Sequence, residues 1–170
     1  MKWKNPLFVV RDMERSKEFY GRLLGLRVVM DFGANVTLTG GVCLQTLESW
    51  QGFLNKAPDQ FAFGGNDAEM YFEEDDFDGF MDRLSQQKDV NLVHPVHQYP
   101  WGQRVVRFYD PDLHIIEVGE SMRRVVVRFL EGGMSVEEAA KASQFPLAFV
   151  LWCKDHPDED PPEIGIATNA

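Results

Sequence analysis

The strongest constraint on this chain is an internal repeat within its first 120 residues. Asn5 stands at the start of one short apolar run, and Glu69 stands at the start of another, 64 residues later. Asp12 follows the first run as a candidate helix N-cap, and Asp76 follows the second run at the same interval. Because a pattern that recurs at a fixed interval marks a repeated folding unit, the sequence predicts two copies of one supersecondary module.

Each module is predicted to contain one strand, one helix and three further strands, which makes the fold class α+β. Apolar residues recur at helical spacing over Phe19–Leu24, and Gly25 is the expected end of that helix. Tight turns are expected at Gly40-Gly41 and at Asp110-Pro111-Asp112. The expected strands are Leu7–Val10, Leu26–Phe32, Val36–Thr39, Val42–Thr46, Met70–Phe72, Val90–His97, Arg104–Tyr109 and His114–Val118.

The expected domain covers residues 1–120, with modules at about 1–48 and 67–120. The connector Trp50–Asn66 is predicted to hold one helical turn that starts near Trp50. Residues 121–154 are predicted to form a small helical extension, a hairpin that buries Phe149, Leu151 and Trp152 against the sheet domain or a second subunit. Ser135 and Glu138 are expected to make a capping box in it. Residues 155–170 are expected to be an acidic tail that is disordered or loosely docked.

Composition narrows the location and the partners. The formal net charge of −10 repels phosphate backbones and argues against nucleic acid as the partner. No apolar run approaches the roughly 18 residues that a membrane span needs, and no signal peptide is recognised, so a cytoplasmic protein is expected. Cys43 and Cys153 have no metal-binding or redox spacing and are expected to be reduced thiols that are partly buried.

Three separated stretches carry a resemblance to a known family: VVRDMERSKEFYGRLLGL, YFEEDDFDGFMDRL and PWGQRVVRFYDPDLHIIEVGE. In this order and at this spacing they resemble the vicinal oxygen chelate superfamily, which includes glyoxalase I, bleomycin-resistance proteins, fosfomycin-resistance enzymes and extradiol dioxygenases. The resemblance covers roughly residues 3–120. It implies that the two modules form a curved mixed sheet around a cavity for a small organic ligand, often in a homodimer.

The resemblance also implies where a metal would be bound. In similar metal-dependent proteins the ligands come from the first and last strands of each module, which here are the positions of Asn5, Gln45, Glu69 and Glu117. Glu117 fits the pattern best, whereas Asn5 and Glu69 stand where histidine is common. An all-oxygen set suits a hard cation such as magnesium or manganese. The alternative, which we favour, is a metal-free cavity in which Glu69 and Glu117 are hydrogen-bonded or solvated.

Aromatic and basic residues supply candidate ligand contacts. Trp101 and Arg104 stand at a corner before a strand, and an indole beside a guanidinium suits an aromatic or carboxylate-bearing ligand. Arg104 and Arg107 lie on opposite faces of that strand, so at most one of them points inward. Alternation along the strands turns Val10 and Met70 toward the helices and Leu7 and Tyr71 toward the concave face, so Tyr71 is a further candidate. Trp50 and Phe53 in the connector are candidates too, and their alternative role is to pack as core.

Three functions are consistent with these features. The first is a small-molecule-binding protein, and the second is a metal-dependent lyase or isomerase of the lactoylglutathione-lyase type, with Glu117 and Glu69 as catalytic residues that move a proton. The third is a ligand-responsive regulator, because the extension resembles a helix-turn-helix. Its recognition helix would be Leu147–Trp152, which is almost wholly apolar and lacks side chains that read base edges.

Overall fold

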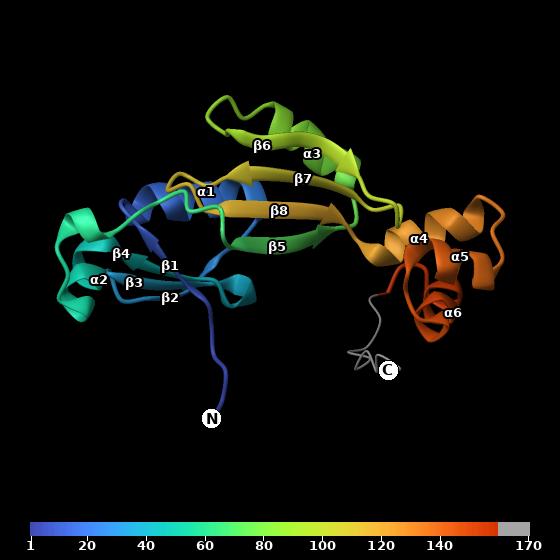
Figure 1. The fold of residues 1–170 in the computed structure, drawn as a ribbon, viewed down its shortest axis with the longest axis horizontal. Helices are drawn as coiled ribbons and strands as arrows, with labels where there is room; N and C mark the ends of the chain where they lie inside the picture. The colour runs from blue at the N-terminus through green and yellow to red at the C-terminus, as the bar shows by residue number, and fades with distance from the viewer. Residues whose placement is uncertain (160–170) are drawn as a thin grey trace. The chain divides into compact units, whose positions relative to one another are not determined.

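In a computed structural model that describes residues 1–159, the strands form two four-stranded mixed sheets (Figure 1). The strand order is β1-β4-β3-β2 in the first sheet and β5-β8-β7-β6 in the second. In the first sheet β1 runs parallel to β4, whereas β4 pairs with β3, and β3 with β2, in antiparallel fashion. The predicted α+β fold of two tandem β-α-β-β-β modules is therefore confirmed. The strands are β1 (Leu7–Val10), β2 (Val28–Asp31), β3 (Asn35–Leu38), β4 (Cys43–Thr46), β5 (Glu69–Glu74), β6 (Leu92–Gln98), β7 (Arg104–Tyr109) and β8 (Ile115–Glu120).

The first helix of each module begins where the sequence predicts. The Asp12 carboxylate accepts a hydrogen bond from the amide of Arg15 (3.0 Å), and helix α1 (Met13–Leu24) ends at Gly25 in the left-handed conformation. The Asp76 carboxylate accepts from the amide of Gly79 (3.0 Å) at the start of α3 (Phe77–Ser85). The connector differs from the prediction, because α2 (Leu47–Leu54) spans eight residues and starts directly after β4.

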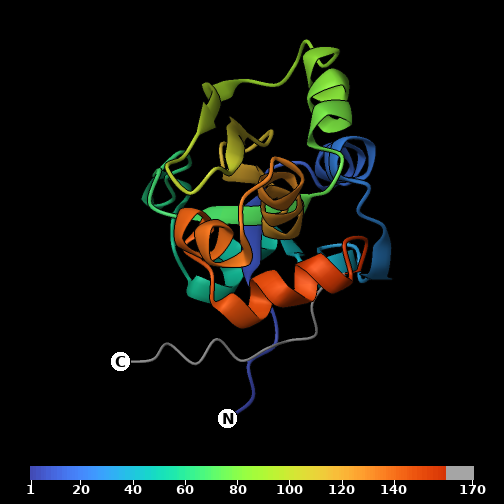
Figure 2. The same ribbon diagram turned by 90° about the vertical axis from the view of Figure 1, so that its right-hand side faces the viewer.

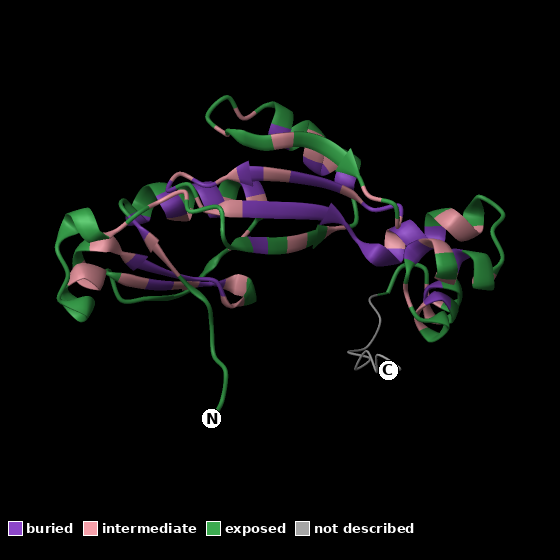
Figure 3. Ribbon diagram, in the orientation of Figure 1, coloured by how far each residue is buried: buried purple, intermediate pink, exposed green. Residues whose placement is uncertain are grey.

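Side chains alternate between the two faces of the strands as predicted. Met70 in β5 is 6% exposed, whereas its neighbour Tyr71 is 49% exposed. In β1 the same alternation separates buried Val10 from exposed Leu7. Figure 3 shows that β8 is mostly buried and that β7 consists of buried and intermediate residues, while β2 and β6 are mostly exposed.

Contacts divide the chain into two compact units. The first comprises Met1–Met70, Asp82–Val93 and Phe108–Ile116, and the second comprises Tyr71–Met81, His94–Arg107 and the described chain from Glu117 onward. The buried core of the first unit includes Val10, Phe19, Tyr20, Leu23, Val36, Leu38, Leu44, Leu84, Phe108 and Ile116, and that of the second includes Phe77, Phe80, Val105, Val106, Val118, Val125 and Val126.

A buried hydrogen-bond network fixes the turn between β7 and β8 in the first unit. The Asp110 carboxylate accepts from the Tyr20 hydroxyl (2.7 Å), from Nδ1 of His114 (2.9 Å) and from the amide of Asp112 (2.8 Å). Burial on its own would raise the pKa of Asp110, but the hydrogen bonds from His114 and Tyr20 lower it below its ordinary value. The predicted turn at residues 110–112 is thus held by its own first carboxylate.

The extension consists of three helices that pack on one another, α4 (Met122–Glu131), α5 (Val136–Ser143) and α6 (Leu147–Asp155), seen together in Figure 2. The predicted capping box at Ser135 and Glu138 is confirmed. Val150 and Cys153 of α6 are buried, whereas Leu151, which we expected to be buried, is 44% exposed.

Cys43 and Cys153 are both buried, and neither forms a disulfide. Burial raises the pKa of the Cys153 thiol to about 11. The predicted acidic tail lies outside the described residues from residue 160 onward. None of the helices within residues 1–159 is long and apolar enough to cross a membrane.

Tyr20→Phe tests the buried network. Removing the hydroxyl leaves the Asp110 carboxylate short of one donor, and we expect the free energy of unfolding to fall by about 1–3 kcal/mol in urea titrations. Tyr109→Phe is the matched control, because its hydroxyl donates to Asn66 in an exposed setting, and we expect less than about 0.5 kcal/mol. Equal losses in the two variants would contradict this account.

Candidate functional site

One face of the sheet in the second unit carries a connected set of polar and aromatic side chains. Tyr71 and Glu73 come from β5, Glu117 from β8 and Arg107 from β7. The others are His94 on β6 and Tyr99, Trp101 and Gln103 in the corner between β6 and β7. We call these eight residues the candidate site.

Gln103 is the centre of the hydrogen bonds in this site. Its Nε2 donates to the Tyr71 hydroxyl (2.8 Å) and to the Glu120 carbonyl (3.0 Å), and its Oε1 accepts from Nε1 of Trp101 (3.0 Å). Gln103 is 5% exposed, so its side-chain amide is buried, and both its nitrogen and its oxygen are hydrogen-bonded. Gly119 leaves the space for it, because a Cβ there would lie 2.7 Å from Nε2 of Gln103.

Tyr71 is held as a neutral phenol. Its hydroxyl donates to Glu73 (2.7 Å) while it accepts from Gln103. Burial raises the pKa of Tyr71 well above its usual value, and the hydrogen bond to Glu73 and the charge of that carboxylate raise it further. The phenol therefore presents a fixed ring, 49% exposed, rather than a base.

A stacked aromatic pair lies beside this amide. The rings of Tyr99 and Trp101 are 4.5 Å apart and nearly parallel, at 6°. The indole is anchored by Gln103, and the Tyr99 hydroxyl accepts from Nη1 of Arg107 (2.8 Å). Because both rings are tied at their polar ends, the pair is ordered in advance of any ligand.

Arg107 joins the aromatic pair to the buried carboxylate of Glu117. The guanidinium forms an ion pair with Glu117, whose side chain is 9% exposed. Nη1 of Arg107 also lies 3.3 Å from Nε2 of His94. Since Nδ1 of His94 faces the Pro95 carbonyl (2.7 Å), that nitrogen carries the proton and Nε2 accepts from Arg107.

Helix α4 supports the corner of the site. Nη2 of Arg128 donates to the Gly102 carbonyl (2.9 Å) and to the buried carboxylate of Glu120 (2.9 Å). Gly102 has a φ of +88°, and a Cβ at this position would overlap the ring of Phe129. The first helix of the extension thereby positions the two residues that flank Gly102, which are Trp101 and Gln103.

Arg104, predicted as a ligand contact, lies on the opposite face of β7 from Arg107. Its guanidinium binds Asp78 of α3 (2.6 Å) and Glu120 of β8 (3.2 Å). The hydrogen bond to Asp78 is the main cause of a raised pKa of Arg104. Arg104 is thus committed to two carboxylates, and Arg107 is the arginine of the candidate site.

The four predicted metal ligands are engaged in ways that fit a cation poorly. Gln45 accepts at Oε1 from Asn35 (2.8 Å) and donates from Nε2 to Ser49, while Asn5 donates to the Gly41 carbonyl (2.8 Å). Glu117 faces Arg107, and Glu69 is an exposed residue of β5. Among residues 1–159, no group of three or more His, Cys, Asp or Glu side chains is arranged to hold a metal ion.

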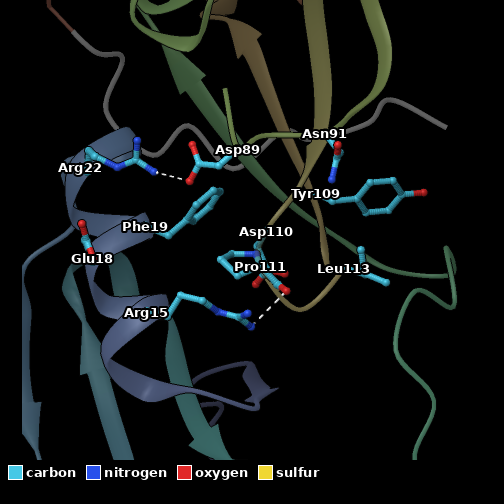
Figure 4. Close-up of a pocket in the computed structure, with 10 residues that line it drawn as sticks. All are labelled: Arg15, Glu18, Phe19, Arg22, Asp89, Asn91, Tyr109, Asp110, Pro111 and Leu113. Atoms are coloured by element: carbon cyan, nitrogen blue, oxygen red, sulfur yellow. Dashed lines mark hydrogen bonds and ion pairs between the residues drawn. The ribbon is translucent and has the colours of Figure 1, made fainter. Parts of the chain in front are cut away.

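The other two predicted ligand contacts, Trp50 and Phe53, belong to α2 in the first unit, where Phe53 is 70% exposed. The same unit has a concavity of about 310 Å³ between α1 and the turn after β7 (Figure 4). Its walls are braced by the Arg22–Asp89 ion pair (2.9 Å) and by Arg15 on the Pro111 carbonyl (3.2 Å). None of the predicted site residues lines it.

Sequence reasoning missed five residues of the candidate site, which are Glu73, His94, Tyr99, Gln103 and Arg107. The available signal for Arg107 was the alternation that places it on the face of the strand opposite Arg104. That alternation does not say which of the two faces carries the site. Gln103 had no local signal, because its three partners lie two, seventeen and thirty-two positions away in the chain.

Comparison with known proteins matches the part of the chain that contains the two modules. A family model described as a glyoxalase-like domain matches residues 3–123. A solved protein of unknown function from Agrobacterium tumefaciens is 41% identical, with a TM-score of 0.64, and the match covers 71% of this chain and 94% of that one. A lactoylglutathione lyase from the same species is 25% identical, with a TM-score of 0.54 and coverage of 71% and 93%.

A glyoxalase-related enzyme from Fulvimarina pelagi shares the fold at 19% identity, with a TM-score of 0.59 and coverage of 71% of this chain and 88% of that one. No curated protein matches the chain. The family model ends at residue 123, so most of the helical extension lies beyond it.

The raised pKa of Tyr71 predicts a pH effect on stability. The folded state holds the phenolic proton more tightly than the unfolded chain, so this stabilisation is complete below the ordinary pKa of 10.0 and is lost as the pH rises above it. In a titration that follows tyrosinate absorbance against pH, Tyr71→Phe should remove an ionisation step that lies above pH 10.0. Loss of a step at the ordinary value instead would contradict the hydrogen bonding described here.

Gly102→Ala tests the support from α4. We expect a loss of more than about 2 kcal/mol in the free energy of unfolding, from backbone strain plus overlap with Phe129. Gly133→Ala is the matched control, because Gly133 has a φ of +90° and nothing within 4 Å of an added Cβ, and should lose about 1 kcal/mol. Phe129→Leu should recover part of the loss in the Gly102→Ala background, and equal losses at both glycines would overturn the contact.

Proposed function

This chain belongs to the glyoxalase-like domain family, and we propose that it is a small-molecule-binding protein whose candidate site receives a planar organic ligand without a metal. The observation that carries the proposal is the stacked Tyr99–Trp101 pair, 4.5 Å apart, tied to Gln103 at one end and to Arg107 at the other. A preordered aromatic surface loses little conformational entropy on binding, and it favours a flat ligand.

Polar groups around the pair would orient such a ligand. Tyr71 is 49% exposed and its hydroxyl is fixed between Glu73 and Gln103, while the guanidinium side chain of Arg107 is 21% exposed. A small number of convergent polar groups beside an apolar surface is typical of sites for small organic ligands. The two carboxylates and one guanidinium also leave this set net negative, which favours neutral or cationic ligands over anionic ones.

A metal-dependent lyase or isomerase is the second candidate. The 25% identity with a lactoylglutathione lyase favours it. In that case Glu117 and Glu69 would be the residues that move a proton, with a divalent cation such as magnesium or manganese beside them. The ion pair between Glu117 and Arg107 is the observation that ranks this candidate second.

A DNA-binding regulator ranks third, because the arginines of the extension are occupied. Arg123 binds Asp75 and the Pro157 carbonyl, Arg128 binds Glu120, and Arg124 lies 3.9 Å from Asp158. The exposed side of α6 carries Leu147 and Leu151 rather than groups that read base edges. The extension therefore fits a packing role better than nucleic-acid recognition.

Trp101→Ala tests the proposal. Planar fragments built on indole or naphthalene should bind the natural protein, and truncation of the stacked indole should weaken the best of them by about tenfold in calorimetric titrations. Trp3→Ala, at a position 79% exposed near the N-terminus, should leave the affinity unchanged. Equal binding by both variants would contradict the assignment, and Trp50→Ala shows whether the connector contributes.

A further inference from the structure

We infer that Arg107 is the built-in cation of the candidate site, and that it occupies the position beside Glu117 that a divalent ion would need. This inference deepens the proposed function, since it explains how the site dispenses with a metal. It is carried by the contacts of Arg107 and by the burial of Glu117.

Three parts of the second unit hold the guanidinium in place. Glu117 of β8 forms the ion pair, the Tyr99 hydroxyl of the corner accepts at 2.8 Å, and Nε2 of His94 on β6 lies at 3.3 Å. The Arg107 side chain is 21% exposed and that of Glu117 is 9% exposed. A partly buried guanidinium with partners on several strands is a structural part of the sheet rather than a mobile surface charge.

The positive charge of a guanidinium disfavours a divalent ion at the same carboxylate. Arginine has five N–H donors, no acceptor, and a charge that persists at all ordinary pH values, so it cannot ligate a metal. A divalent ion at Glu117 would be repelled by a like charge within a few ångströms in a site with little water to screen it. It would also have to take the carboxylate from its present partner.

Removal of the guanidinium should reverse this relation. Glu117 would then be a carboxylate with 9% exposure and no charge partner from Arg107, and such a group needs a proton, a water molecule or another cation. An added divalent ion would be the partner that satisfies a carboxylate by oxygen ligation. Loss of Arg107 should therefore create sensitivity to metal that the natural protein lacks.

The experiment uses manganese ions and five forms of the full chain, one of which is Glu117→Gln alone. The natural protein and Arg104→Met should show no manganese bound by electron paramagnetic resonance and no change in thermal midpoint with about 1 mM manganese. Arg104 is the matched control, because it lies on the same strand and Glu120 keeps Arg128 when Arg104 is removed. Arg107→Met should gain about 3 °C or more with manganese, and adding Glu117→Gln should abolish that gain.

Two results would overturn the inference. One is stoichiometric manganese in the natural protein that Glu117→Gln removes, a result that does not require Arg107→Met to fold. The other is a manganese shift in Arg107→Met no larger than that in Arg104→Met. Binding of aromatic fragments is measured separately, so a metal-loaded protein that still loses fragments on Trp101→Ala overturns this inference and the metal-free part of the proposal, and leaves the aromatic ligand surface standing. A natural protein that binds no manganese and also binds no fragment contradicts only the proposed function.

Discussion

A carboxylate buried in the middle of a sheet has to be paired, and the pairing of Glu117 with Arg107 sets the character of this site. The guanidinium reaches Glu117 on one side and the Tyr99 hydroxyl on the other, and Tyr99 stacks on Trp101. The Arg107 side chain therefore both neutralises the charge of Glu117 and holds the aromatic pair in place. Gln103 closes the arrangement, because its buried amide ties the indole to Tyr71 and to the backbone at Glu120.

The helical extension has a structural connection to this arrangement. Phe129 fits against Gly102, and Arg128 reaches both the Gly102 carbonyl and Glu120, so α4 braces the corner that carries Trp101 and Gln103. The family model ends at residue 123, just after α4 begins. The residues beyond it thus add support to a site made by the family domain, and Arg128 among them is used in an internal ion pair with Glu120.

Local features of the fold could be predicted because their causes are local. Asp12 and Gly25 bound α1 through a side chain and a backbone conformation that act within a few residues, and both predictions are confirmed. Alternation along β5 predicted which of Met70 and Tyr71 is buried. The length of helix α2 was underestimated because Pro58 and the Gly64-Gly65 pair indicate a loop with at most one helical turn, although the helix is complete before them.

The candidate site could be predicted only in part, because its contacts join residues that are distant in the chain. The resemblance directed attention to Glu117, Tyr71 and Trp101, yet nothing near Glu117 in sequence announces Arg107 as its partner. Alternation placed Arg104 and Arg107 on opposite faces, and only the packing of Asp78 and Glu120 against Arg104 shows which one the site uses. Tertiary partners decide the role of a charged side chain, and they are not encoded in spacing.

The most direct test of the central claim is a fragment titration monitored by the indole N–H signals of the four tryptophans in nuclear magnetic resonance, with chelator present. The account predicts that planar fragments shift the Trp101 signal, whose N–H is bonded to Gln103, and leave Trp3 and Trp152 unchanged. Shifts confined to Trp50, or shifts at Trp101 that appear only after a divalent metal is added, would contradict it.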